Sequence, residues 1–136
     1  MRDRILFLPV LMVLSLASPT VTAADAPMPL AGSEWGFKDE AGGDQRFVQF
    51  GADGVVSGSG GCNRFSGTYV QKGGELLTSS LRVTLMFCGE DGVMDREQAF
   101  LEALDAARRL EASHLELKLM SADGTVVLDL ARRDFD

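Results

Sequence analysis

Residues 58–69 read GSGGCNRFSGTY, a glycine-rich run that passes into a strand-like pattern. Gly60 and Gly61 allow a strand to bend sharply or a neighbouring backbone to come close. Asn63, the only asparagine in the chain, tolerates left-handed backbone angles and can bond its own turn. A glycine-rich phosphate loop needs a Gly-Lys-Ser/Thr ending or a following helix, and neither is present. The run therefore predicts a bent strand.

Short segments with period-two patterning flank this run, and glycines separate them. Within the run itself, Phe65, Gly67 and Tyr69 share one side, where the small residue leaves a shallow gap that aromatic rings can cover. The segment 82–87 places Val83 and its alternate neighbours on one face. The expected strands cover residues 34–38, 46–50, 54–60, 65–71, a short segment at Leu76 and Leu77, 82–87, 114–119 and 125–130.

Three glycine-containing turns join neighbouring strands. Residues 51–54 (GADG) and 121–124 (SADG) are near copies in which Asp-Gly supplies positions of positive φ. Residues 72–74 (KGG) form a third hairpin signal. Connections this short require antiparallel neighbours, because a parallel return needs a crossover of about a dozen residues.

Residues 93–110 change to helical spacing, with apolar side chains recurring at three- and four-residue steps. These apolar residues are Phe100, Leu101, Leu104 and Ala107. Asp91 or Asp95 can cap the start of the helix, and Arg108 and Arg109 in its last turn suit the negative end of the dipole. Strands, one helix and two further strands predict an α+β domain. We expect a strongly curved, barrel-like antiparallel sheet of about eight short strands, packed on one α-helix.

The N-terminus has the three parts of a secretory signal. Two arginines precede an apolar run over residues 5–17, and small residues lead to a cleavage site after Ala23, with cleavage after Ala26 as the alternative. The apolar run is shorter than the roughly 20 residues that span a membrane. We expect a signal peptide over 1–23, a flexible Ala/Pro-rich lead-in over 24–32 and one domain over 33–133. Neither cysteine is placed to carry a lipid anchor, so we expect a periplasmic or secreted protein.

The chain is acidic, with a formal net charge of −7. Because the predicted signal peptide carries a net charge of +1, the mature chain carries −8. Such a domain is repelled by nucleic acid and by anionic lipid. We therefore expect no nucleic-acid partner, no membrane span and a monomer.

Two cysteines, Cys62 and Cys88, in a chain bound for an oxidising compartment predict one disulfide. A thiol nucleophile needs a base, but the only histidine, His114, lies on a strand face opposite the leucines. One histidine is also a poor basis for a transition-metal site. Acidic residues gather near the helix start without the spacing of an EF-hand, and there they suit the helix dipole. These residues are Glu90, Asp91, Asp95 and Glu97. We therefore expect no catalytic residue, metal or cofactor.

Residues 61–69 (GCNRFSGTY) resemble the signature of the META or HslJ-like domain, which occurs in bacterial envelope proteins and some protozoa. Further pieces agree in order: Trp35, then Phe50 with Gly54, Val55 and Gly58, then residues 84–88 (TLMFC), then Glu97 with Phe100, Leu101 and Leu104. The resemblance extends from Leu30 to about Leu130. The family often has Thr-Arg-Met-Ala-Cys at 84–88, so Leu85 and Phe87 replace a basic and a small residue.

The resemblance implies a non-enzymatic exported envelope protein with a binding or structural role in stress or resistance. One alternative is a periplasmic carrier of a small apolar ligand, with a cavity lined by residues such as Val48, Phe50, Leu117 and Leu128. Another is an inhibitor or adaptor that presents the 62–69 loop to a protein partner. Its candidate contact residues are Asn63, Arg64, Phe65 and Tyr69. An adaptor needs exposed apolar side chains, for instance Phe65, Tyr69 or Phe87. Otherwise Phe65 and Tyr69 pack into the core and Arg64 alone is exposed.

Overall fold

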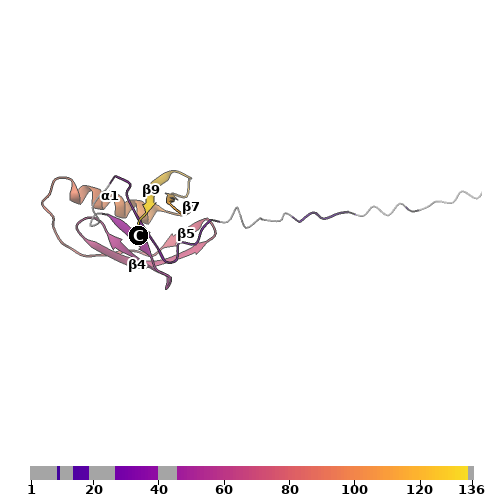
Figure 1. Cartoon of the computed structure of the whole chain (residues 1–136), viewed down its shortest axis with the longest axis horizontal. Helices are drawn as coiled ribbons and strands as arrows, with labels where there is room; N and C mark the ends of the chain where they lie inside the picture. Colours follow the sequence, from indigo (N-terminus) through magenta and orange to yellow (C-terminus); the bar gives the residue numbers. More distant parts are fainter. Residues whose placement is uncertain (1–8, 10–13, 19–26, 40–45, 135–136) are drawn as a thin grey trace, which may run out of the picture.

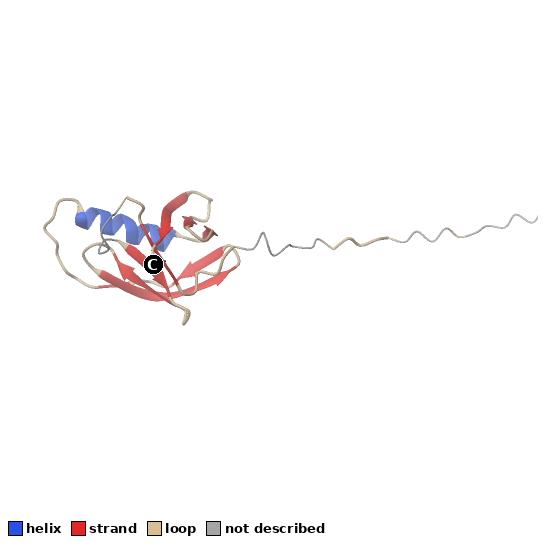
Figure 2. Ribbon diagram, in the orientation of Figure 1, coloured by secondary structure: helices blue, strands red, loops and turns tan. Residues whose placement is uncertain are grey.

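A computed structural model describes residues 9, 14–18, 27–39 and 46–134. These residues form one helix and nine strands (Figure 2). The strands are β1 (Ser33–Gly36), β2 (Phe47–Phe50), β3 (Val55–Ser59), β4 (Arg64–Lys72), β5 (Glu75–Thr78), β6 (Arg82–Val83), β7 (Arg109–Ala112), β8 (Glu116–Met120) and β9 (Val126–Arg132), and the helix is α1 (Val93–Ala106). The helix is too short and too polar to cross a membrane. Most of the predicted signal peptide, and both cleavage sites, lie outside the described residues.

The strands form one antiparallel sheet that closes into a ring. Its order is β3-β2-β1-β9-β8-β7-β5-β4, and a further pairing between β3 and β4 closes it. The two-residue strand β6 pairs with the start of β4. Figure 1 shows α1 lying along one side of this curved sheet. The predicted class, a barrel-like antiparallel sheet packed on one helix, is confirmed.

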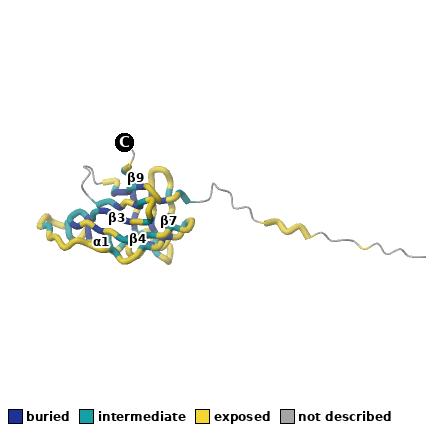
Figure 3. The backbone as a smooth tube through the Cα atoms, turned by 90° about the horizontal axis from the view of Figure 1, so that it is seen from below, coloured by how far each residue is buried: buried dark blue, intermediate teal, exposed yellow. Residues whose placement is uncertain are grey.

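Alternate residues of the strands point inward and form one core. This is the outcome expected for strands with one face buried and one face in water. Figure 3 shows buried positions recurring along the strands of the ring. The helix contributes Phe100, whose ring meets Phe37 and Phe65 edge-to-face at centroid distances of 5.3 and 5.8 Å. The core residues at most 1% exposed include Leu30, Trp35, Val48, Phe50, Val56, Phe100, Leu104, Ala107, Leu117, Leu119 and Leu130.

The two near-copied turns have the same hydrogen bonds. In each, the aspartate Oδ1 accepts the backbone N–H two residues on, at 3.1 Å for Asp53 and 3.0 Å for Asp123. Bonds from Ser121 and Thr125 lower the pKa of Asp123 to about 2. Positive φ falls on the glycines alone, at 82° for Gly54 and 88° for Gly124, and no other residue type in the described chain has it. The expectation of positive φ at these aspartates was wrong, and Asn63, which tolerates such angles, does not adopt them.

The helix ends four residues earlier than predicted. Ala107 is extended, with φ −65° and ψ 130°, and the following residues form β7, a strand that spacing alone does not reveal. Leu110 continues the helical apolar spacing but is buried from a strand, opposite Leu119. Arg108 lies outside the helix, yet its Nη1 still donates to the carbonyls of Asp105 and Ala107, at 2.6 and 2.8 Å.

The start of α1 also differs from prediction. Neither Asp91 nor Asp95 caps it by its side chain. The N-cap is Gly92, in a left-handed conformation with φ 77°. Asp95 lies in the first turn, where a negative charge suits the dipole.

The lead-in is attached to the domain over its described part, from residue 27 onward. Leu30 is fully buried, and its N–H donates to Gln71 Oε1 at 2.7 Å. The Gln71 amide in turn donates to the Met28 carbonyl at 3.0 Å. Hydrogen bonds to Gln71 thus connect Met28 and Leu30 to β4.

Candidate functional site

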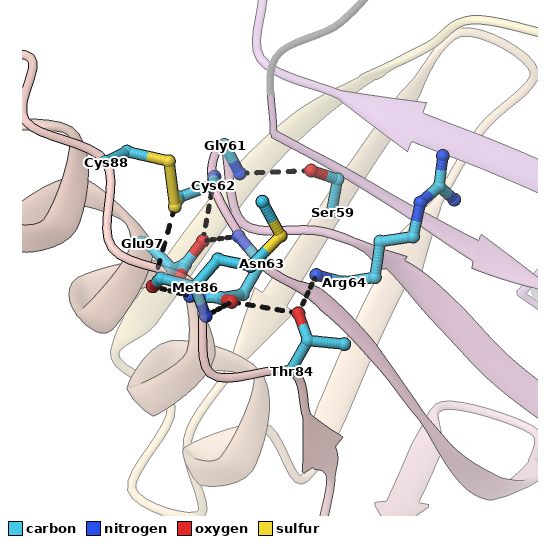
Figure 4. Close-up of a disulfide and its surroundings, with 9 residues drawn as sticks. All are labelled: Ser59, Gly61, Cys62, Asn63, Arg64, Thr84, Met86, Cys88 and Glu97. Atoms are coloured by element: carbon cyan, nitrogen blue, oxygen red, sulfur yellow. Dashed lines mark hydrogen bonds between the residues drawn. A yellow bond between two sulfur atoms is a disulfide. The ribbon is translucent and has the colours of Figure 1, made fainter.

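The Asn63 side chain uses all four of its hydrogen-bonding positions, the most that an amide can make. Its Nδ2 donates to Glu97 Oε1 at 2.7 Å and to the Met86 carbonyl at 3.0 Å. Its Oδ1 accepts from Thr84 Oγ1 at 2.8 Å and from the Met86 N–H at 2.6 Å. Figure 4 shows these bonds joining the start of β4, residues 84–86 and α1. We call Asn63, Thr84, Met86 and Glu97 the Asn63 network.

Glu97 is a buried carboxylate, only 4% exposed. Its Oε2 accepts two successive backbone N–H groups, from Cys62 at 2.9 Å and Asn63 at 2.6 Å. Burial raises the pKa of Glu97, but these bonds, with the bond from the Asn63 side chain, favour the charged form and leave the pKa below its usual value. The position shares a helical face with Phe100 and Leu104, three and seven residues on. That placement is a sequence signal that the dipole interpretation of the acidic residues overlooked.

Two glycines let the backbone approach this carboxylate. A Cβ on Gly60 would lie 2.4–2.8 Å from side-chain atoms of Glu97, closer than real side chains allow. Gly61 has φ 108°, which disfavours any other residue. The predicted close approach thus occurs against a side chain of the helix. The gap expected above Gly67 is filled by Ser79 and Leu81 rather than by aromatic rings.

A disulfide joins Cys62 to Cys88, with the two Cα atoms 5.9 Å apart. It links the residue before Asn63 to the end of residues 84–88, so two cross-connections hold that segment. Met86 is bonded through its backbone to Asn63, and Cys88 is bonded through sulfur to Cys62. These contacts replace strand pairing, which is why β6 stops at Val83 instead of continuing to residue 87 as predicted.

Around these two connections, residues 85–87 expose three large apolar side chains. The exposed fractions are 99% for Leu85, 61% for Met86 and 85% for Phe87. We call these three residues the apolar loop. The alternation that predicted a strand with Leu85 and Phe87 on one face belongs instead to a loop whose side chains stand in water.

A groove of about 420 Å³ adjoins the apolar loop on the outer face of β2, β3, β4 and β6. Arg64, Arg82 and Thr84 line it, together with polar residues that lie opposite one another across the four strands. Gln49 pairs with Ser57, Ser57 pairs with Ser66, and Ser66 pairs with Arg82. We call it the arginine groove.

The four predicted contact residues separate in the structure. Asn63 and Phe65 are buried, at 4% and 3% exposure. Tyr69 is half-buried, and its hydroxyl donates to the Gly51 carbonyl at 2.6 Å. Arg64 alone is exposed. Since residues 64–72 form β4, the segment is not a free loop, and the exposed apolar surface lies at residues 85–87.

The interior leaves little room for the predicted carrier cavity. Val48, Phe50, Leu117 and Leu128 belong to the same core cluster as Phe100 and Leu104 from the helix. A second groove, of about 650 Å³, lies outside the ring and is lined by Val70, Leu77, Lys72 and Arg109 among others. His114 is exposed, and both cysteines are oxidised. Within the described ranges, no three or more His, Cys, Asp or Glu side chains group as metal ligands do.

Comparison with known proteins places this fold in a family. The META domain family matches residues 29–134. The heat shock protein HslJ of Escherichia coli is 31% identical over 84 residues, which cover 62% of this chain and 59% of HslJ, less than two thirds of that relative. An NMR structure of a protein from Burkholderia xenovorans has a TM-score of 0.64 at 21% identity, covering 91% of this chain and all of that one.

A crystal structure of a DUF4847 family protein from Bacteroides vulgatus has a TM-score of 0.50 at 21% identity, over 68% of this chain and 62% of that one. At these identities the two solved structures show a shared fold only. The family match is of another kind, because it covers all nine strands, the helix and the Asn63 network. The chain belongs to the META domain family.

Proposed function

We propose that the protein is exported and acts without catalysis, as a contact protein of the cell envelope that presents the apolar loop to a partner. The observation that carries this proposal is the exposure of Leu85, Met86 and Phe87 on a backbone held at both ends. Binding costs less when the contacting segment is already ordered, since less conformational entropy is lost. Exposed large apolar side chains that gather in one place mark interaction sites.

The bonds that hold the apolar loop support a role for its side chains in contact rather than in folding. The network atoms at residues 84–86 are the Thr84 hydroxyl and the Met86 backbone, none of which requires large apolar side chains at positions 85 and 87. The core needs neither Leu85 nor Phe87, because both stand in water. A partner would account for three such side chains together.

Export is supported by the signal pattern at the N-terminus and by the disulfide, which persists in oxidising compartments. We propose a signal peptide over 1–23 and a domain that begins near residue 28. The relative from E. coli is described as a heat shock protein, and we propose a stress-related role for this chain as well. N-terminal sequencing of protein from the periplasmic fraction should start at Ala24 or Pro27. An intact Met1 there would contradict export.

Photo-crosslinking in cells tests the contact role directly. A photoreactive phenylalanine analogue replaces Phe87 in one strain and Leu77 in a control strain. Leu77 is also a large exposed apolar residue, at 59%, but lies on the outer face of β5 away from the loop. We expect adducts at position 87 well above those at position 77. Equal or absent adducts at the two positions would reject the apolar loop as the contact surface.

A further inference from the structure

We infer that the apolar loop and the arginine groove form one membrane-contact surface, on which a phospholipid places its phosphate in the groove while the loop enters the interface of the bilayer. This inference rests on the proposed function, because it names the partner of the same loop. It concerns a surface that touches a bilayer and not a segment that spans one.

The loop has the side chains that such insertion needs. Leucine, methionine and phenylalanine lose unfavourable contact with water when they enter the boundary of the acyl chains. Their exposed fractions of 99, 61 and 85% leave nearly all of this surface available. No core residue has to move for the loop to insert.

At the centre of the loop, the backbone polar groups already have the hydrogen-bond partners that an apolar medium requires. A peptide group that leaves water must have its N–H and C=O bonded within the protein. Both polar groups of Met86 are already bonded to Asn63, at 2.6 Å for the N–H and 3.0 Å for the carbonyl. The Asn63 network therefore removes a desolvation cost at the middle residue of the loop.

The groove has the chemistry of a phosphate site. Its lining holds two arginines and several hydroxyl or amide groups, and none of its lining residues is acidic. Neither Arg64 nor Arg82 forms an ion pair with a described carboxylate, and the hydroxyls of Ser57 and Ser66 make no bond to a described residue. Guanidinium groups bind phosphate oxygens in a two-pronged geometry. The groove and the loop are continuous, because Thr84 lines the one and directly precedes the other.

The charges near the proposed contact surface determine which lipid composition the protein should bind. Charges farther than about 8 Å from a surface are largely screened at physiological salt, so the net charge of the whole chain has little effect at the contact. Glu90 and Asp91 follow Cys88 in the chain and balance the two arginines. We therefore expect binding to bilayers that carry phosphate headgroups without a requirement for excess anionic lipid.

Vesicle flotation provides the test. The full chain is purified as the cell processes it, and its intact mass establishes whether residues 1–23 are gone, since their apolar run would itself bind lipid. The protein is floated with phosphatidylcholine vesicles and with vesicles that contain phosphatidylglycerol. The loop variant is Leu85→Ser/Phe87→Ser, and its control is Val70→Ser/Leu77→Ser, which removes exposed apolar side chains from β4 and β5. The groove variant is Arg64→Gln/Arg82→Gln, and its control of equal charge is Lys72→Gln/Arg109→Gln.

We expect the wild-type protein to float with both kinds of vesicle. The loop variant should partition at least about tenfold more weakly, since each buried Leu or Phe accounts for roughly a factor of ten. The groove variant should bind about thirtyfold more weakly, since each of its two arginines contributes about 1 kcal/mol near the surface, and both controls should match the wild type. Free inorganic phosphate at millimolar concentration should not release the protein, because it replaces only the headgroup contact.

Three results would overturn the inference. The first is wild-type protein that stays with the soluble fraction for every vesicle. The second is equal weakening by the loop variant and its control. The third is a dimer in analytical ultracentrifugation that the loop variant alone dissociates, which would assign the loop to a second copy of the chain. A protein adduct at position 87 without flotation would leave the contact role standing and reject only the lipid.

Discussion

At the scale of single residues, the domain depends on one buried pair, Asn63 and Glu97. Each is nearly inaccessible to water, and the bonds between them and the surrounding backbone satisfy both side chains. A buried network of this kind stabilises one arrangement strongly, because any missing partner leaves a desolvated polar group. The pair holds the apolar loop in place although both residues are almost fully buried.

Glu97→Gln should lower the free energy of unfolding at pH 7 by about 2–4 kcal/mol. The substitution removes charge-assisted hydrogen bonds. It also places the NH₂ group of the new glutamine next to an N–H donor, either of the backbone or of the Asn63 side chain. Urea titrations of both proteins measure the difference. A loss under about 0.5 kcal/mol would mean that the network contributes little.

The same pair of proteins should differ in pH dependence. The pKa of Glu97 is lowered in the folded state. Its stabilising effect is therefore complete above the pKa that Glu97 has in the unfolded chain, about 4.3. It is lost as pH falls through the folded pKa. The wild-type protein should therefore lose its advantage over Glu97→Gln below about pH 4, since the other carboxylates titrate in both proteins and cancel. A constant difference from pH 7 to pH 3 would contradict the assignment.

Gly60→Ala should destabilise the domain by about 1–3 kcal/mol, because the new methyl group has no room beside Glu97. Gly89→Ala is a matched control, since a Cβ there meets nothing within 4 Å and its φ is not in the left-handed region. Thermal unfolding of the two variants should separate them by several degrees. Equal midpoints would show that the close approach at Gly60 is relieved without cost.

At the scale of elements, strands and turns follow from the sequence better than the segments between them. Period-two patterning places Val48, Phe50, Leu117 and Leu119 inward, as observed, because a strand with one face in the core needs that alternation. The same pattern fails at residues 85–87, where the Met86 backbone bonds to the Asn63 side chain instead of to a neighbouring strand. The end of α1 was not predictable either, because a buried Leu110 is compatible with a longer helix as well as with a strand. The spacing of apolar residues does not reveal which hydrogen-bond partner the backbone will have.

The helix prediction can be measured by Leu104→Ala. The side chain is 1% exposed within the core, so its removal should cost about 2–5 kcal/mol. Leu101→Ala, at a half-buried position, should cost less, and Glu102→Ala, at an exposed position, should change stability by about 0.5 kcal/mol or less. Denaturant titrations that rank the three in another order would contradict the packing of α1.

At the scale of the whole molecule, the ring and the disulfide act on different states of the chain. Ring closure joins distant segments in the folded state, whereas the disulfide restricts the unfolded chain. The fold class was predictable because each element is short and its connections require antiparallel neighbours. The proposed contact surface was not, because Asn63 and Phe65 of the most specific motif turn inward, whereas positions 85 and 87 face out.

Cys62→Ala/Cys88→Ala should lower the free energy of unfolding by about 3.5 kcal/mol, given a sequence separation of 26 residues. Adding a reductant should shift the urea midpoint of the wild-type protein toward that of the variant and leave the variant unchanged. If a thiol-alkylating reagent labelled both cysteines in unreduced native protein, the cross-link would be absent in solution.

Closure through β1 and β9 also sets the timing of folding. The first strand pairs with the last, at Trp35 with Arg132 and Gly36 with Ala131, so the ring stays open until β9 has left the ribosome. Until then Leu30, Val48 and Phe50 have no completed interior to enter. A chain of this design is still unfolded when most of it has been synthesised, which is the state that a narrow translocation channel admits. The topology thus delays folding until synthesis is nearly complete, which would favour transfer of the unfolded chain if the protein is exported as we propose.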